Sequence, residues 1–356
     1  MVRFAERDRH LIFLEPEGLD TDEVYVNGVS TSLPADTQDA LIRSIAGLER
    51  AELVRYGYAV EYDSVPSWQV WPTLETKPVA GLYLAGQILG TSGYEEAAAQ
   101  GLVAGINACR DLTGAAPWLP TRSESYLGVL IDDLVTKEIL EPYRMFTSRA
   151  EHRLRLRCDN AETRLETSAA ELGLLPVADL EAMRQRNAAV RSVVDLLSTR
   201  RAEVAGGGPP ATVADLLRQP GVDLASLWGR LGDGQELKAA IDNALSELPH
   251  FAARSALAEA ECTIVYSGYI MKSDKHLSRQ AHLENLEVPA GFDYGAITAL
   301  SFEAREKLAR MRPATLGQAG RIDGVRAGDL AVLSIHLKRW RETPDPGDDR
   351  DDVTMG

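Results

Sequence analysis

Three glycines, Gly86, Gly90 and Gly93, stand in a short turn between an apolar segment and a long run of helix-forming residues. Glycine lets a ligand approach the backbone closely, and the first N–H groups of a helix have no partner within that helix. A helix that begins near Tyr94 would therefore favour an electron-rich ligand at its positive end. The same pattern also fits an ordinary strand-to-helix crossover that binds nothing, and the residue types alone leave both interpretations open.

Arginines gather in a second segment, residues 141–157, although the chain as a whole has a net charge of −15. Five arginines stand there against two glutamates, a local sum of +3: Arg144, Arg149, Arg153, Arg155 and Arg157. A helix would place three of them on one face at a spacing of four, and a strand would align Arg153, Arg155 and Arg157 by alternation. Either row would suit phosphate groups, whereas a solvated face paired with acidic neighbours is the alternative.

Other chemistries find little support in the residue types. Cys109, Cys158 and Cys262 are far apart and form no CxxC pair, which argues against a disulfide framework or a thiolate zinc site. The histidines lack metal-ligand spacing, so we expect them to be surface or structural residues. Neither G-x-G-x-x-G nor a Walker A loop is present. No apolar stretch reaches the ~20 residues of a membrane span, and a soluble cytoplasmic protein is the default expectation.

The elements that must position these residues can be read from the apolar spacing. Residues 10–15 and 52–62 have the content of strands, and residues 36–48 have helical spacing with Asp36 placed to cap the start. Residues 79–85 predict a short apolar strand, and a helix should follow from about 94 to 111. Ser92 and Glu95 have the spacing of a capping box, which would fix where this helix begins.

The predicted helix at 94–111 carries two stripes. Small residues at spacings of three or four would let it lie close to a sheet or a ligand: Ala97, Gly101, Gly105 and Ala108. The second stripe is apolar, so we expect the thiol of its last member to be buried: Ala98, Leu102, Ile106 and Cys109.

Helix-forming residues dominate from about residue 121 onwards, and strand signals nearly vanish. Residues 205–210, Ala-Gly-Gly-Gly-Pro-Pro, have the composition of a linker, and the last 16 residues are rich in Asp, Pro and Gly. Residues 314–322 and 329–340 predict two helices joined at Asp323-Gly-Val325. This junction fits either a hairpin that grips a nucleic-acid backbone or an ordinary corner in a helical bundle.

Several long strings resemble the MnmG (GidA) family of tRNA wobble-uridine modification enzymes, in the order of that family. They cover most of the chain: Ile12-Phe-Leu-Glu-Pro-Glu-Gly18, Asn27-Gly-Val-Ser-Thr-Ser-Leu-Pro34, Gly57-Tyr-Ala-Val-Glu-Tyr-Asp63, Gly86-Gln-Ile-Leu-Gly-Thr-Ser-Gly-Tyr-Glu-Glu-Ala-Ala-Ala-Gln-Gly101 and Glu141-Pro-Tyr-Arg-Met-Phe-Thr-Ser-Arg-Ala-Glu151. The loop at 64–71 departs from the family's wording.

The resemblance implies a fold class of α/β followed by all-α, with an incomplete FAD/NAD(P)-binding Rossmann-like domain and a small β-rich section. Residues 1–120 would be the C-terminal portion of the FAD-binding domain, and 121–205 a helical, tRNA-facing region. A linker at 206–210, a helical partner- and tRNA-docking domain at 211–340 and a disordered acidic tail at 341–356 would follow.

The resemblance also implies ligands and partners. FAD would contact Gly86, Gln87, Thr91, Gly93 and Tyr94. tRNA would contact Arg144, Arg149, Arg153 and Arg157, with Arg321, Lys338 and Arg339 as further candidates. The family enzyme uses NADH and methylenetetrahydrofolate, acts with the GTPase MnmE and forms a homodimer.

In this family the pyrophosphate loop and a catalytic cysteine precede the part that this chain matches. We therefore expect a truncated form with no catalytic residue and no metal site of its own. Two alternatives remain. One is a tRNA- or protein-binding module that has lost flavin. The other is a folate-dependent tRNA methyltransferase of the TrmFO type, which the long helical region argues against.

Overall fold

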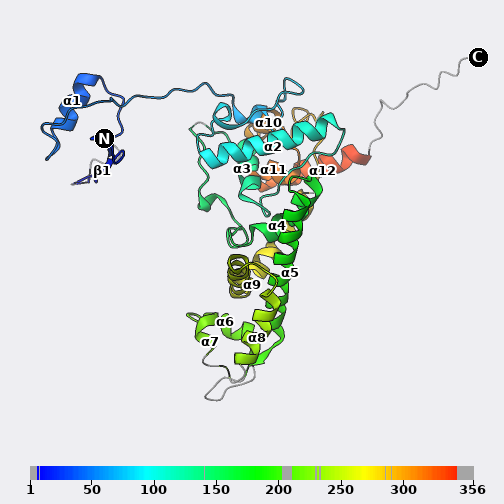
Figure 1. Ribbon diagram of the computed structural model, residues 1–356. Coiled ribbons are helices and arrows are strands. Elements are labelled where there is room, and N and C mark those ends of the chain that lie inside the picture. The colour runs from blue at the N-terminus through cyan, green and yellow to red at the C-terminus, as the bar shows by residue number, and fades with distance from the viewer. Residues whose placement is uncertain are drawn as a thin grey trace, which may run out of the picture. The chain divides into compact units, whose positions relative to one another are not determined.

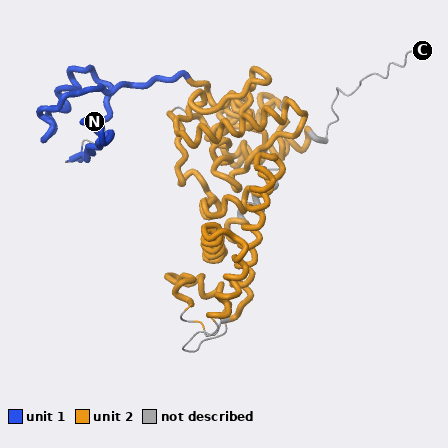
Figure 2. The backbone as a smooth tube through the Cα atoms, in the orientation of Figure 1, with its two compact units in different colours: residues 1–63 blue, residues 64–356 orange. Residues whose placement is uncertain are grey.

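The computed structural model describes residues 6–7, 9–139, 141–202, 211–228, 231, 234–284, 286–289 and 291–342, with the backbone alone at 202, 276–282, 284 and 341–342. The expected linker at 206–210 and the expected tail from residue 343 lie outside these residues. The chain divides into two compact units, residues 1–63 and residues 64–356 (Figure 2).

The described residues of the first unit form one small sheet and one helix. Its elements are β1 (Phe13–Pro16), β2 (Val24–Asn27) and α1 (Ala35–Arg43). β1 and β2 pair in antiparallel register, with Phe13 opposite Asn27. The predicted strand and helix are therefore confirmed in kind, although α1 ends at Arg43. The expected cap is wrong, because the N-cap residue is Pro34 and Asp36 lies inside the first turn.

The predicted strand at 52–62 is wrong. The structure has no strand there, and the large side chains from Val54 to Tyr62 are exposed. The backbone of Gly57 is held by a side chain instead, since the Gln38 amide donates to its carbonyl and accepts from its N–H, each at 2.8 Å. Alternating apolar residues predict which face of a strand is covered, but a strand also needs a neighbouring backbone to pair with.

The second unit opens with irregular backbone and two helices. Its first elements are η2 (Ser67–Gln69), η3 (Gly86–Leu89), α2 (Tyr94–Leu112), α3 (Tyr126–Thr136) and η4 (Thr147–Arg149). The predicted helix at 94–111 is confirmed by α2. The predicted strand at 79–85 is wrong, because only Tyr83 forms an isolated bridge there and Gly81 turns the chain at φ +76°. Leu74, Leu89, Val103 and Ile131 form the small core beneath this segment.

A helical bundle follows. Its elements are α4 (Ala161–Leu172), α5 (Val177–Thr199), β3 (Arg201–Ala202), β4 (Ala211–Thr212), α6 (Val213–Leu217), α7 (Leu224–Leu227), α8 (Gly234–Leu245) and α9 (His250–Glu284). The long helices α5 and α9 lie side by side (Figure 1). Their shared core includes Val193, Leu197 and Ile264. Inside it, Arg186 pairs with Glu259 at 2.7 Å, so a buried charge has its partner.

The last core is built by α10 (Phe302–Met311), α11 (Leu316–Arg321) and α12 (Ala327–Glu342). α11 and α12 confirm the two helices predicted around Asp323-Gly-Val325. Leu308, Leu316 and Leu333 are fully buried there, and Trp68 from the start of the unit packs against the same core. The expected fold class, α/β followed by all-α, is confirmed, and the small β section is consistent with a partial Rossmann-like domain. Among the described helices, none is both long and apolar enough to cross a membrane.

Candidate functional site

The glycine-rich turn before α2 is held by one buried glutamine. Gln100, from the second turn of α2, accepts a hydrogen bond from the N–H of Gly86 and donates one to the hydroxyl of Thr91 at 2.7 Å. Gly86 and Thr91 are buried, and Thr91 is fully so. Gly86 and Gly90 adopt φ of +79° and +72°, which side chains with a Cβ rarely do. These residues therefore fix the shape of the turn from beneath.

The start of α2 is closed on one side by an acidic side chain. The N-cap residue is Gly93, no side chain caps the helix, and the expected capping box of Ser92 and Glu95 is wrong. Glu96 lies there instead, and its carboxylate accepts a hydrogen bond from the N–H of Met145 at 3.1 Å. A side chain at Gly93 would collide with this carboxylate. The hydrogen bond from Met145 is the main cause that holds the pKa of Glu96 below its usual value.

The other side of the same helix start is open. The Tyr94 side chain is 89% exposed and Gln87 is partly exposed. The N–H groups of Tyr94 and Glu95 have no acceptor among the described residues. Of the five residues predicted to contact flavin, Gln87 and Tyr94 can reach an external group, and Gly86, Thr91 and Gly93 shape the turn behind them. The negative charge of Glu96 offsets part of the positive end of the helix dipole.

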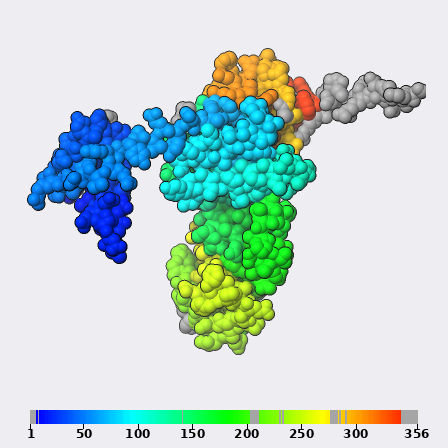
Figure 3. Space-filling model, turned by 45° about the horizontal axis from the view of Figure 1, so that its top comes forward, coloured from blue at the N-terminus to red at the C-terminus, as the bar shows by residue number. Residues whose placement is uncertain are grey.

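α2 turns a different face to the core than its stripes predicted. Its buried residues include Gln100, Val103 and Asn107. Of the predicted apolar stripe only Ile106 is buried; Leu102 and Cys109 are exposed, so the expected buried thiol is wrong. The reason is that two amides direct the helix inward: Gln100 holds the turn, and Asn107 accepts from the N–H of Trp118 at 2.8 Å. An apolar pattern cannot reveal buried amides of this kind. The surface of α2 is open to view in Figure 3.

The small-residue stripe of α2 is uncovered in this chain. Gly101 and Gly105 are exposed, and a Cβ at either position would meet nothing within 4 Å. Leu102 is 49% exposed beside them. The predicted close approach of a sheet or ligand to this stripe is therefore not made by the described residues.

The arginine segment forms neither a helix nor a strand over residues 150–157, so neither predicted row of arginines exists. The segment is a series of turns, in which the N–H of Arg155 bonds the carbonyl of His152 at 2.8 Å. Side chains anchor it from several directions, and this tertiary anchoring overrides the alternation of Arg and Leu. Arg155 pairs with Asp274 of α9. Arg157 forms a two-pronged pair with Asp159, in which Nε and Nη2 donate to the two carboxylate oxygens, each at 3.0 Å.

The four arginines predicted to contact tRNA differ in how exposed they are and in the partners that they have. Arg144 is 61% exposed, with Glu96 at 3.7 Å. Arg153 is exposed and has no partner among the described residues. Arg149 lies 4.5 Å over the ring of Tyr143 and keeps one side open to solvent. Arg157 is only 11% exposed and is held by Asp159.

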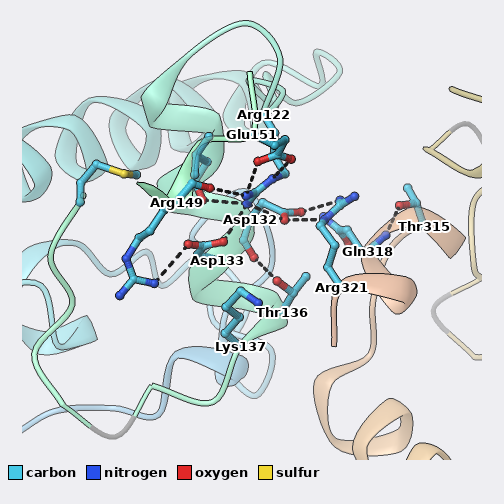
Figure 4. A network of polar contacts seen from close by, with 12 residues as sticks. Arg122, Asp132, Asp133, Thr136, Lys137, Arg149, Glu151, Thr315, Gln318 and Arg321 are labelled. Atoms are coloured by element: carbon cyan, nitrogen blue, oxygen red, sulfur yellow. Dashed lines mark hydrogen bonds and ion pairs between the residues drawn. The ribbon is translucent and has the colours of Figure 1, made fainter. Parts of the chain in front are cut away.

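A network of charges that the sequence did not single out lies next to this segment (Figure 4). Arg122 pairs with Asp132 at 3.1 Å, with Asp133 at 2.7 Å and with Glu151 at 2.9 Å. Burial alone would lower the pKa of Arg122, but the hydrogen bond to Glu151 and the charges of the two aspartates raise it above its usual range. The adjacent Asp-Asp pair in an otherwise apolar helix is the one signal that could have predicted this network.

The network also reaches the C-terminal helices. Arg321 of α11 bonds the two carboxylate oxygens of Asp132 at 2.7 and 2.8 Å, so this candidate for nucleic-acid contact is engaged within the chain. Tyr143 donates to Asp133 at 3.0 Å. Burial, and then the charge of Asp133, raise the pKa of Tyr143 and keep its hydroxyl protonated. Among the described residues, no group of His, Cys, Asp and Glu is arranged to hold a metal ion.

Two family models match the chain. "Glucose inhibited division protein A" matches residues 1–116, and "tRNA modifying enzyme MnmG/GidA C-terminal helical bundle" matches residues 276–354. The tRNA uridine 5-carboxymethylaminomethyl modification enzyme MnmG of Rhodopirellula baltica is 46% identical over 95% of this chain and 49% of its own length. The enzyme of the same name from Protochlamydia amoebophila is 45% identical over 96% of this chain and 52% of its own length.

Solved structures agree. Aquifex aeolicus GidA in its form II crystal has a TM-score of 0.80 and 42% identity, and covers 94% of this chain and 53% of its own. The form I crystal gives a TM-score of 0.78 at 41% identity. The chain spans about half the length of the curated relatives that it matches. Agreement in sequence and in fold over nearly the whole of this chain shows that it belongs to the MnmG (GidA) family.

Proposed function

We propose that this chain serves in the C5 carboxymethylaminomethyl modification of the wobble uridine of tRNA, as one part of an MnmG-type enzyme. The observation that carries the proposal is the 45–46% identity to enzymes named for this modification, over 95% of the chain or more. The open arginines of residues 141–157 and the open start of α2 are the two places where the chain offers chemistry suited to it. We place this activity in the cytoplasm.

The tRNA-facing surface of this proposal is the arginine segment. Arg144 and Arg153 carry exposed guanidinium groups that can bond phosphate oxygens directly. Arg149 can reach a phosphate from its place over Tyr143, and Arg157 would act mainly by holding the turn in shape. Such phosphate contacts give affinity that falls steeply with salt and carry no sequence information.

We propose that the start of α2 forms one side of an FAD site. Gln87, Tyr94 and the N–H groups of the first turn fit an electron-rich ring edge, with Gly86, Thr91 and Gly93 shaping the turn. FAD supplies redox chemistry, for which NADH and methylenetetrahydrofolate would be the co-substrates of the complete enzyme. None of the three cysteines of this chain is proposed as a nucleophile. MnmE is the proposed partner of the C-terminal helices, and a homodimer the proposed assembly.

Two measurements on the purified chain test the proposal. Binding of a tRNA transcript, followed by fluorescence anisotropy between 50 and about 200 mM salt, should weaken steeply as salt rises. Arg144→Ala and Arg153→Ala should each lower the slope of log K against log salt by about 1. Arg191→Ala, at an exposed arginine of α5 outside this segment, is the matched control and should leave the slope unchanged.

Added FAD followed by desalting tests the flavin site. If the wild type retains flavin absorbance after desalting and Gln87→Ala retains less, the result supports a site at the start of α2. A colourless protein that still binds tRNA supports the second candidate, a non-catalytic RNA-binding module, which the carboxylate of Glu96 beside Gly93 favours. A chain that binds neither tRNA nor FAD would contradict both candidates.

A further inference from the structure

A small hollow lies between the turn at residues 151–155 and the side of α9. We call it the Tyr269 hollow; Arg153 and Leu154 line it from the turn, and Tyr269 and Ile270 line it from α9. Its volume is about 130 Å³. Pockets that enclose drug-sized ligands measure about 300–1,000 Å³, so this hollow suits one small planar group and is too small for a dinucleotide.

The hollow is pre-formed, because its two walls are bonded to each other. His152 is 7% exposed, and its Nδ1 lies 2.9 Å from the hydroxyl of Ser273 on α9. The next tie along the turn is the ion pair of Arg155 with Asp274. With both walls fixed in advance, a ligand would not have to order them, which lowers the entropic cost of binding.

The charges around the hollow leave an excess of positive groups. Glu151 is turned to Arg122, with which it makes two hydrogen bonds of 2.9 Å, and Arg155 is balanced by Asp274. Arg153 and Lys272 are both exposed, and neither has a partner among the described residues. Lys272 follows Tyr269 by three positions on α9, so the two lie on the same face of the helix.

An aromatic ring completes the site. Tyr269 is 63% exposed although it belongs to a long, well-packed helix, and Leu154 beside the hollow is 38% exposed. Proteins that bind unpaired RNA stack bases on rings of this kind and hold the neighbouring phosphates with Arg and Lys. The combination of a flat ring, an apolar wall and two open cations is what one nucleotide requires.

We propose that the Tyr269 hollow receives one unstacked base of the RNA substrate, with the base on the Tyr269 ring and the adjoining phosphates on Arg153 and Lys272. This inference rests on the proposed function, namely that the chain binds tRNA. It adds a base-stacking site to what would otherwise be contacts with phosphates alone, and it makes Tyr269 a binding residue.

Tyr269→Ala in the full chain tests the inference, with tRNA binding measured by fluorescence anisotropy. Loss of one stacked base should weaken binding about 5- to 150-fold, whereas Tyr269→Phe, which keeps the ring, should stay within about twofold of the wild type. Phe251→Ala is the matched control, because Phe251 is an exposed aromatic residue of the same helix, 79% exposed and remote in sequence from the hollow. Lys272→Ala should instead lower the salt slope by about 1.

A second readout locates the base directly. A transcript that contains 4-thiouridine, irradiated in complex with the chain, should crosslink to the peptide that carries Tyr269, as identified by mass spectrometry. The hollow is overturned as a base site if Tyr269→Ala binds tRNA as tightly as Phe251→Ala does and no crosslink to that peptide forms. The proposed function would stand in that case, because the chain would still bind tRNA in a salt-dependent way. In that case the exposed ring would point to a protein partner. No tRNA binding by the wild type would overturn both.

Discussion

Asp133 shares one buried charge among three partners, one from before α3 and two from residues 141–157 after it. Its carboxylate lies 2.7 Å from Arg122, 3.0 Å from the Tyr143 hydroxyl and 3.6 Å from Arg149. Its side chain is 2% exposed. Asp133→Ala would leave Arg122 and Tyr143 short of a partner in a buried place, and removal of one member of a buried pair costs about 3–5 kcal/mol. We expect about 3 kcal/mol here, because Arg122 keeps two other carboxylates.

Urea unfolding followed by circular dichroism measures this loss. Glu303→Ala is the control, because Glu303 pairs with Lys307 on the surface of α10 at 53% exposure. Surface pairs of this type contribute roughly 0–1 kcal/mol. Equal losses in the two variants would show that the charges around Asp133 are not coupled to folding.

Lys77 is a second residue whose charge bears on stability. Its ammonium group donates to the carbonyls of Trp68 and Met311, and burial, with a smaller effect of Arg312, lowers its pKa from 10.5 to about 8. Between pH 8 and 10.5 the unfolded chain therefore binds more protons at this residue than the folded chain. Its contribution to the free energy of unfolding must then rise with pH across that window.

The comparison of wild type with Lys77→Met isolates this effect. Melting temperatures measured from pH 7 to about 10 should fall less steeply, or rise, in the wild type relative to the variant above pH 8. The variant also loses two hydrogen bonds, so only the difference in slope is informative. Parallel curves would mean that Lys77 is not desolvated in the folded chain.

The elements of this chain differ in how well a sequence can predict them. α2, α11 and α12 follow from local spacing and were predicted within a few residues. The strands expected at 52–62 and 79–85 were not formed, because a strand depends on a partner backbone that local spacing does not specify. The predicted row of arginines was wrong for a related reason, because contacts with α9, far away in the sequence, determine the turns of this segment.

The same limit applies to the candidate site. Glycines and a helix start could be read from the sequence, and so could the local excess of arginine. The roles of Gln100 and Glu96 could not, because each depends on which face of α2 is buried. The Tyr269 hollow has no local signature, since its walls are more than 100 residues apart.

α2 itself yields a prediction at the scale of an element. Gly101 and Gly105 lie inside a helix with open space around them, so Gly101→Ala or Gly105→Ala should raise the free energy of unfolding by about 0.5–1 kcal/mol each. Gly128→Ala in α3 is the matched control, because a Cβ there would overlap the backbone of Thr121 and should destabilise the chain. Thermal melts of the three variants check the order. A loss of stability at Gly101 would mean that its face of α2 is covered in solution.

At the scale of the whole molecule, several polar links join the C-terminal helices to the segment that contains the candidate site. Arg321 of α11 holds both oxygens of Asp132 on α3, and Lys77 bonds the carbonyl of Met311 at the end of α10. Trp68 adds an apolar contact with the core of the same helices. The C-terminal helices therefore have a defined contact with α3, made largely by charged side chains, beside the arginines proposed to face tRNA.

Arg321→Ala should weaken the contact of the C-terminal helices with α3 without unfolding these helices, because the core of α10, α11 and α12 does not contain Arg321. We expect faster hydrogen exchange in α3 and α11, where the link is lost, and unchanged exchange in α5 and α9, whose core is separate. Arg218→Ala is the matched control, since Arg218 makes an exposed pair with Asp215 away from this contact. Hydrogen exchange followed by mass spectrometry distinguishes the outcomes. Faster exchange throughout the second unit would mean that Arg321 supports the whole fold. No change in α3 would mean that the remaining contacts, among them the bond of Lys77 to Met311 and the packing of Trp68, hold the C-terminal helices without Arg321.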